Sequence, residues 1–286
     1  MSVAGVPIVS CLTSCYGRFG AVAAIERVRD AGLEYVELPI RTAGHASRAG
    51  DEPLLTEQSG EAEVAAVERL LDANGVRLSS VNAISGNPLR PGVVDIVLRK
   101  LDLAARLGVT KVVTEAGGHD NDDERPALLE QLRRIGDRAA DLGLTVCFET
   151  HRGVCVNHRE MIQLMKELEH PALRLNFDTA NLLYYNTDTF VEIALAKACH
   201  FVKSLHLKDS MGEFGSWYFP ALGTGGGVDF LRVLQIMRGV GFRGPYTLEI
   251  GGVEGEGELS LDEYHARVVE SVRYLRGLGY FDMQRT

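Results

Sequence analysis

Three carboxylates and one imidazole stand at the ends of short apolar runs in the second half of this chain. Each belongs to a run that is typical of a β-strand, and the four are Glu149, Asp178, His206 and Glu249. Gathered in one place, side chains of these types would bind one divalent metal ion and leave room for the oxygens of a substrate. The pattern therefore predicts an enzyme.

A cation is expected because the carboxylates cannot lie together without one. Like charges in a partly dry pocket raise one another's pKa, and burial adds to the cost. Three oxygen donors and one nitrogen suit Mn²⁺, which we expect first, or Mg²⁺, Co²⁺ or Zn²⁺. Such an ion would stabilise the charge that develops when a proton leaves a carbon next to a carbonyl. Glu149 and Glu249, from well-separated strands, would then act as base and acid.

The elements that must position these residues alternate between strand-like and helix-like patterns. The expected strands are residues 7–14, 35–40, 77–83, 109–116, 145–150, 173–178, 201–209 and 246–250. The expected helices are residues 21–31, 61–74, 93–107, 125–142, 158–168, 189–198, 228–240 and 261–275. Eight such units without a break in composition predict a (β/α)8 TIM barrel, a single domain over residues 1–286. The alternative, a doubly wound sheet, lacks a GxGxxG fingerprint after its first strand.

In a barrel of this kind the carboxyl ends of all strands share the face where active sites lie. Besides the four ligand candidates, this convergence predicts a pocket lined by Glu37, Asn82 and Glu115. The loops after the fourth and seventh strands overhang the same face, which adds His119 and Trp217 as substrate-binding candidates. The ring of Trp217 would stack on a sugar or anchor its own loop.

Five segments of the chain resemble the xylose isomerase-like TIM barrels, and they are ETH (149–151), NFDTAN (176–181), HLKD (206–209), LGTGGGVDF (222–230) and LEI (248–250). More narrowly, they resemble the sugar phosphate isomerase/epimerase group, which includes ketose 3-epimerases, hydroxypyruvate isomerases, inosose dehydratases and 3-dehydroshikimate dehydratases. The resemblance covers nearly the whole chain. It implies that the four residues named first are the metal ligands, and that Glu149 and Glu249 move the proton. His151 and Lys208 match positions that face the substrate in dehydratase-like members.

The chain also departs from parts of this family. The epimerases usually carry a histidine where this chain has Asn181, a substrate-binding candidate, and an arginine where it has Gly212. The type-IV apurinic endonucleases of the same superfamily use histidines where this chain has Asn82, Glu115 and Asn181. A DNA-repair activity is therefore a remote alternative.

These observations lead to three functional hypotheses. The leading one is a metal-dependent isomerase or epimerase that acts on a keto-sugar or polyol-ketone through a metal-stabilised enediolate. The second shares the first step but then expels a β-hydroxyl or glycosidic oxygen, which makes a dehydratase or lyase. Here His151 would be catalytic or would orient Glu149, and Lys208 would bind substrate, donate a proton or pair with a carboxylate. The third is a catalytically silent sugar-binding barrel.

Composition restricts the partners and the compartment. The net charge of −9 repels phosphate backbones, so nucleic acid is an unexpected partner. No apolar stretch is long enough to span a bilayer and the first residues lack a basic leader, so a cytoplasmic location is expected. The five cysteines are scattered, which favours reduced, mostly buried thiols. The GTGGG run at 223–227 is only weak support for phosphate binding. A homodimer or homotetramer is expected by analogy with related barrels.

Overall fold

A closed barrel of parallel strands forms the centre of the protein. The computed structural model describes residues 6–45, 47 and 50–282. Its barrel strands are β1 (Val9–Leu12), β2 (Tyr35–Arg41), β4 (Arg77–Asn82), β5 (Lys111–Thr114), β6 (Thr145–Glu149), β7 (Leu173–Asp178), β8 (Val202–Leu207) and β10 (Tyr246–Leu248). They pair in the order β1-β10-β8-β7-β6-β5-β4-β2, and a pairing of β1 with β2 closes the ring. The predicted TIM barrel is confirmed.

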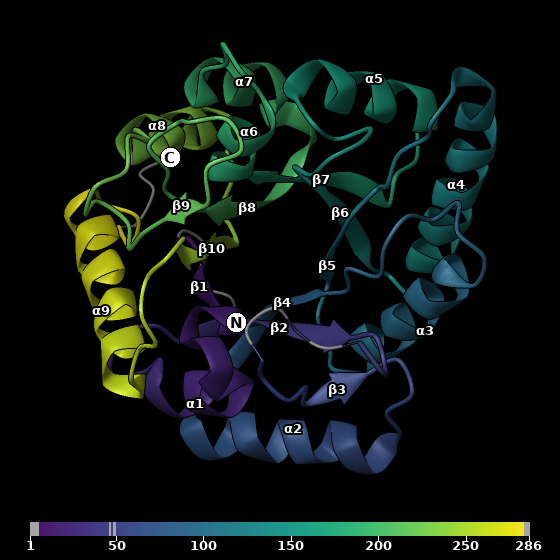
Figure 1. Cartoon of the computed structure of the whole chain (residues 1–286). Helices are drawn as coiled ribbons and strands as arrows, with labels where there is room; N and C mark the ends of the chain where they lie inside the picture. The colour runs from purple at the N-terminus through teal and green to yellow at the C-terminus, as the bar shows by residue number, and fades with distance from the viewer. Residues whose placement is uncertain (1–5, 46, 48–49, 283–286) are drawn as a thin grey trace.

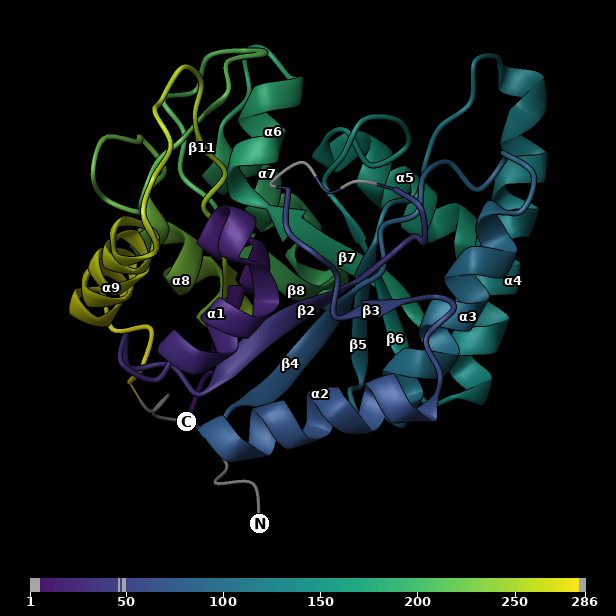
Figure 2. The same ribbon diagram turned by 60° about the horizontal axis from the view of Figure 1, so that its bottom comes forward.

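Helices surround the barrel (Figures 1 and 2). In the described residues they are α1 (Gly20–Arg27), α2 (Glu61–Asn74), α3 (Val93–Arg106), α4 (Arg125–Asp141), α5 (His158–Leu168), α6 (Thr179–Tyr185), α7 (Val191–Ala198), α8 (Phe230–Gly239) and α9 (Leu261–Gly277). Three 3-10 turns, η1 (Thr13–Phe19), η2 (Asp122–Glu124) and η3 (Cys199–Phe201), complete the helical elements of the same residues. The prediction missed α6, because it begins directly after a strand with no turn residues between them. None of the helices in the described part of the chain combines the length and apolar character that a membrane crossing requires.

Short strands outside the barrel join loops on its carboxyl face. In the described residues, β3 (Leu55–Thr56) pairs with the end of β2, and β9 (Tyr218–Phe219) pairs antiparallel with β11 (Gly252–Val253). The second pairing connects the loop after β8 to the loop after β10. None of these short strands was predicted, because two residues are too few to show a period.

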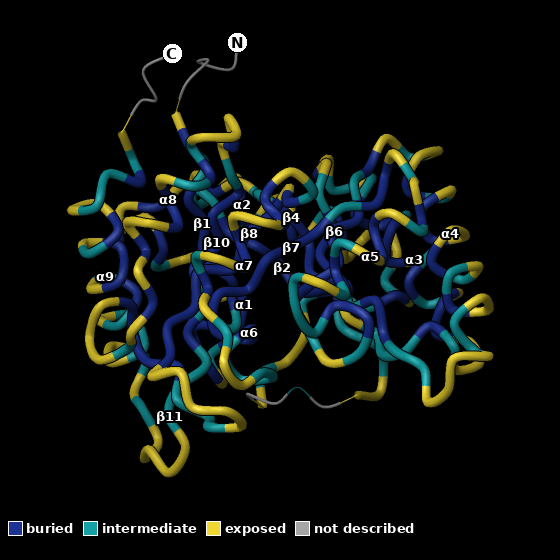
Figure 3. Tube along the Cα trace, turned by 90° about the horizontal axis from the view of Figure 1, so that it is seen from above, coloured by how far each residue is buried: buried dark blue, intermediate teal, exposed yellow. Residues whose placement is uncertain are grey.

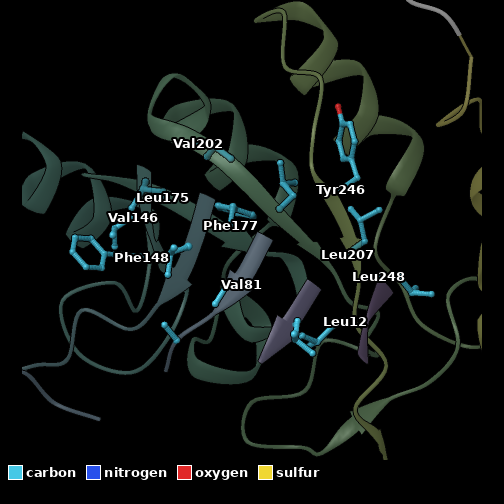
Figure 4. Packing of buried hydrophobic residues seen from close by; sticks show 14 of the residues in the cluster. Leu12, Val81, Val146, Phe148, Leu175, Phe177, Val202, Leu207, Tyr246 and Leu248 are labelled. Carbon is cyan, nitrogen blue, oxygen red and sulfur yellow. The ribbon is translucent and has the colours of Figure 1, made fainter. Parts of the chain in front are cut away.

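The apolar core lies between the strands and the helices, whereas many of the side chains inside the barrel are polar. Buried residues occupy the centre of the molecule and exposed ones its edge (Figure 3), and Phe148, Phe177 and Leu248 illustrate the apolar cluster (Figure 4). At alternating positions the strands carry fully buried polar side chains: Ser10, Glu37, Ser80, Asn176, Ser204 and Thr247. Branched apolar residues usually fill this space. Here it holds hydrogen-bonding groups directly beneath the carboxyl face.

A buried lysine ties together two loops of the carboxyl face. Lys100 of α3 is fully buried, and its ammonium donates hydrogen bonds to Thr42 Oγ1 at 3.0 Å and to the Ile84 carbonyl at 2.9 Å. Thr42 follows β2 and Ile84 follows β4. Burial lowers the pKa of Lys100 from 10.5 to about 8, against the opposing charge of Glu57.

This lowered pKa predicts a pH-dependent stability. Between about pH 8 and 10.5 the unfolded chain binds more protons at Lys100 than the folded chain does. The free energy of unfolding therefore increases as pH rises through this window, and the added stability is lost as pH falls to about 8. Urea unfolding of the wild type and of Lys100→Met should show a difference that changes by roughly 3 kcal/mol across this window. A difference that stays constant with pH would contradict the assignment.

Candidate metal centre

The four predicted ligands meet at the carboxyl face of the barrel. Glu149 ends β6, Asp178 ends β7, His206 lies near the end of β8, and Glu249 directly follows β10. One ligand atom from each side chain lies within 4.8 Å of the others. Asp178 and His206 are opposite each other in the β7–β8 register, so strand pairing itself places this pair together. The neighbouring pairs β6–β7 and β8–β10 bring Glu149 and Glu249 to either side of it.

Several atoms of the cluster are buried without a hydrogen-bond partner in the described part of the chain. They are Glu149 Oε2, Asp178 Oδ2 and His206 Nδ1. The Nδ1 atom has Glu249 Oε2 at 2.8 Å and Glu149 Oε1 at 3.3 Å, yet it makes no aligned hydrogen bond to either. Buried polar atoms are rarely left without partners, so each of these needs an explanation. A divalent cation among them provides one, and the donor set of carboxylates and imidazole fits such an ion.

The electrostatics of the cluster show how strongly the carboxylates interact. Burial, with the charges of Glu249 and Glu149, raises the pKa of Asp178 to about 7, although Lys208 opposes this. Burial alone would lower the pKa of His206, but Glu37 and the other carboxylates outweigh it and raise that pKa well above its usual range. Burial would raise the pKa of Glu249, but Lys208 and His206 hold it well below its usual range. The chain therefore compensates the carboxylates with its own two cationic groups.

A hydrogen-bond network beneath the cluster fixes the ring of His206. Its Nε2 lies 3.0 Å from Glu37 Oε1, so Glu37 holds the N–H at Nε2, and Nδ1 is the nitrogen that faces Glu149 and Glu249. Ser80 and Asn82 donate to the same Glu37 carboxylate at 2.7 and 3.3 Å. Partners of this kind orient metal-binding histidines. Glu37 is fully buried, so it lies beneath His206 rather than at the substrate-facing position predicted for it. Asn82 contacts the Glu37 carboxylate and keeps a small exposed fraction, so its role in substrate binding stays a prediction.

The two oxygens of Asp178 have separate environments. Its Oδ1 accepts hydrogen bonds from the backbone N–H groups of Ala180 and Asn181, and so caps the amino terminus of α6. Its Oδ2 points to the other three side chains of the cluster. The side chain of Thr150 receives the backbone N–H of Asp178. The hydrogen bonds from α6 to Oδ1 therefore fix the carboxylate so that Oδ2 faces the cluster.

Lys208 joins the metal centre to an aromatic layer. Its ammonium lies 2.7 Å from Glu249 Oε1 and 3.1 Å from Asn181 Oδ1. It also lies 4.4 Å from the ring centroid of Phe219 and 5.8 Å from that of Trp217. The Asn181 amide in turn donates to Glu149 Oε1 at 3.3 Å. Lys208 and Asn181, both predicted from the sequence, therefore connect the two glutamates.

The remaining candidates lie farther out on the same face. His151 Nε2 is 3.1 Å from the hydroxyl of Tyr185, and its Nδ1 is 3.7 Å from Glu115 Oε2. The structure thus brings Glu115 and His151 together, with Tyr185 as a partner that the sequence did not suggest. His119 contacts Arg125 at the start of α4, 3.2 Å away, and its role in substrate binding stays a prediction.

Two residues with no predicted role in the site support its surroundings. Cys15 supports Glu249, and Asp209 supports the loop after β8. The Cys15 thiol donates to the Leu248 carbonyl at 3.4 Å and accepts the Ile250 N–H at 3.2 Å, so it holds the peptide groups on both sides of Glu249. Asp209 accepts the backbone N–H of Gly223 at 3.1 Å. The Gly223 N–H is therefore already bonded to a carboxylate of the chain itself. This contact removes the support for a phosphate site at the glycine run. A sequence carries no signal for such contacts.

Comparison with known proteins places the chain in a family. Residues 25–278 match the model of the xylose isomerase-like TIM barrels, so the chain belongs to that family. The expected membership is thereby confirmed. Membership of the family implies the fold, whereas the reaction depends on the residues of the site.

Curated relatives fall into two classes of enzyme. A ketose 3-epimerase from Arthrobacter globiformis is 26% identical over 242 residues, which are 79% of this chain and 76% of that enzyme. An inosose dehydratase from Clostridium botulinum (strain Alaska E43 / Type E3) is 36% identical over 99 residues, 34% of this chain. The second match spans only 33% of the dehydratase.

Solved structures share the fold at low sequence identity. A xylose isomerase-like TIM barrel protein from Mycobacterium smegmatis, crystallised in complex with magnesium, superposes with a TM-score of 0.73 at 19% identity and covers 96% of each chain. A D-allulose 3-epimerase from Methylomonas sp. in complex with D-allulose gives 0.71 at 17% identity and covers 97% of this chain and 99% of that one. Both likenesses support the closed barrel.

Proposed function

We propose that this protein is a divalent-metal-dependent isomerase or epimerase that acts on a keto-sugar or polyol-ketone. The observation that carries the proposal is the convergence of four ligand atoms, several of them buried without partners, at the carboxyl face of the barrel. The similarity to a ketose 3-epimerase over most of the chain supports the reaction class. Proton removal next to a carbonyl is the step that this site favours.

Each residue of the cluster has a part in this reaction. Glu149, Asp178, His206 and Glu249 would hold the ion. When bound, the ion would supply Lewis-acid stabilisation of negative charge on the substrate's oxygens. Glu249 has 17% of its side chain exposed and Glu149 6%, whereas Asp178 and His206 have none, so the two glutamates face the side that a substrate can reach. They are the residues that would take and return the proton.

A second candidate function is elimination, as in a dehydratase or keto-glycoside lyase. The observation in its favour is the buried Lys208 ammonium, which lies 2.7 Å from Glu249 and holds the pKa of that carboxyl low. A carboxylate so paired is a weak proton acceptor. Burial would lower the pKa of Lys208, but Glu249 and Asp178 outweigh it and raise that pKa, so the ammonium would stabilise the negative charge of a departing oxygen by a hydrogen bond. The similarity to inosose dehydratases over part of the chain agrees with this route.

One assay in D₂O separates these reactions. Incubation with candidate ketoses and Mn²⁺ should give an epimer or isomer that carries deuterium at the reacting carbon. Elimination would instead give an enone, which is detected by its ultraviolet absorbance. Exhaustive chelation should abolish either reaction, and Mn²⁺, Mg²⁺, Co²⁺ and Zn²⁺ can then be compared for their ability to restore it. Full activity after chelation would refute the metal-dependent mechanism.

A further inference from the structure

Asp209, next in sequence to Lys208, lies at the centre of the long loop between β8 and α8. Its side chain is buried, and its Oδ1 accepts the backbone N–H of Ser210 at 3.0 Å and of Val228 at 3.2 Å, while its Oδ2 accepts that of Gly223 at 3.1 Å. These donors come from the start, the end and the glycine run of the loop. We call residues 210–228 the aromatic loop.

The glycine run makes this arrangement sterically possible. A Cβ atom added to Gly226 would overlap with the carboxylate of Asp209, so the backbone packs directly against that group. The φ angle of Gly226 lies outside the left-handed region, so space alone requires glycine there. The next residue differs, because a Cβ on Gly227 would find its nearest neighbour, the Ser210 carbonyl oxygen, at 3.8 Å.

The aromatic loop contacts the metal centre on two sides. It carries Trp217 and Phe219, whose rings lie over the Lys208 ammonium. It is also joined to the chain that follows Glu249, because β9 pairs with β11 and the Trp217 indole donates to the Gly251 carbonyl at 3.1 Å. A shift of this loop would therefore move the surroundings of both Lys208 and Glu249.

We propose that Asp209 is a positioning residue for the reaction. By gathering the backbone of the aromatic loop it sets Trp217 and Phe219 against Lys208, and through Lys208 it sets the orientation of Glu249. The role assigned to turnover depends on the proposed function, whereas the effect on the loop does not. Glu149, Asp178 and His206 are held by partners outside the aromatic loop, so the site should still bind the metal ion, and a change at Asp209 should affect turnover more than metal affinity.

Two substitutions disturb the same contact from opposite sides. Asp209→Asn keeps the shape of the side chain but replaces one acceptor with an amide, and Gly226→Ala pushes a methyl group against the unchanged carboxylate. Each should lower kcat/KM by about 10- to 100-fold, because small misplacements near a reacting centre have effects of this size. Trp217 is the only tryptophan of the chain, so its fluorescence should shift to longer wavelength as the loop loosens. Mn²⁺ affinity, measured by calorimetry, should fall by a smaller factor than kcat/KM does, because three of the four ligands keep their partners.

Matched controls lie beside both substitutions. Gly227→Ala adds the same methyl group where there is room for it. Asp229→Asn changes an exposed carboxylate that caps α8 by accepting the Arg232 N–H. Both controls should keep the emission and kcat/KM of the wild type. Equal behaviour of test and control variants, or a loss of Mn²⁺ affinity that accounts for the loss of turnover, would overturn the proposal. If the wild type turns over no ketose, the proposed function fails while the emission measurement still decides the role of Asp209 in the loop.

Discussion

Asp178→Asn is expected to weaken the binding of Mn²⁺ by about 100-fold or more while the fold stays intact. The Oδ1 atom of Asp178 caps α6, and asparagine is an equally good cap, so the helix keeps its hydrogen bonds. The Oδ2 atom, buried without a hydrogen-bond partner among the described residues, becomes an amide nitrogen that cannot bind a cation. Isothermal calorimetry with Mn²⁺ and circular dichroism test the two parts of this prediction separately.

The control for this substitution is another helix cap. Asn157 caps α5 by accepting the backbone N–H groups of Arg159 and Glu160. Asn157→Ala should lower the free energy of unfolding by about 1 kcal/mol without a change in Mn²⁺ affinity. If Asp178→Asn bound Mn²⁺ as tightly as the wild type, the metal centre would have to lie elsewhere.

At a Mn²⁺ concentration that saturates the variant, Glu249→Gln is expected to reduce turnover by about 10²- to 10⁴-fold and to leave binding of a substrate analogue nearly unchanged. The amide has almost the shape of the carboxylate but cannot accept the proton of the substrate. Lys208 keeps Asn181 as a partner at 3.1 Å, so the ammonium remains hydrogen-bonded. Deuterium incorporation from D₂O reports proton transfer, and calorimetry with the analogue reports binding.

This experiment also decides between an enzyme and a silent sugar-binding barrel. Loss of turnover with retained binding identifies Glu249 as a catalytic residue, whereas a silent barrel would show binding without turnover in the wild type as well. Glu254→Gln is a suitable control, because the Glu254 carboxylate is exposed and lies in the same loop. The substitution also preserves the hydrogen bond from the Glu254 backbone N–H to the Trp217 carbonyl. Turnover by Glu249→Gln at the rate of the wild type would exclude the proton-transfer role.

The predictable part of the metal centre rests on a simple regularity. A polar residue that ends an apolar run marks the end of a strand, and parallel strands of a barrel bring their carboxyl ends to one face. Glu149, Asp178, His206 and Glu249 were found in this way, and the structure brings them together. Lys208 and Asn181 were named from the family resemblance, and they contact the same cluster.

Other parts of the site depend on contacts that run across the barrel. Glu37 was expected at the end of a strand, yet β2 continues beyond it to Arg41, so its fully buried carboxylate lies inside the barrel and supports His206. The Cys15 thiol brackets Glu249 from a position 234 residues earlier in the chain, and nothing local to either residue indicates it. The same holds for Asp209, whose partners are backbone amides spread over the aromatic loop.

The sequence by itself determined the alternation of strands and helices, the closed barrel and the strand-end residues that meet on one face. Those properties follow from local periodicity, because the face of an element that becomes buried is written in the spacing of its apolar residues. Only the tertiary structure decided which polar groups hold the ligands in place. It also decided that α6 orients Asp178 and that the Asp209 carboxylate accepts the backbone N–H of Gly223 in the glycine run. Such pairings depend on depth and register between distant segments, and these are fixed only when the barrel closes.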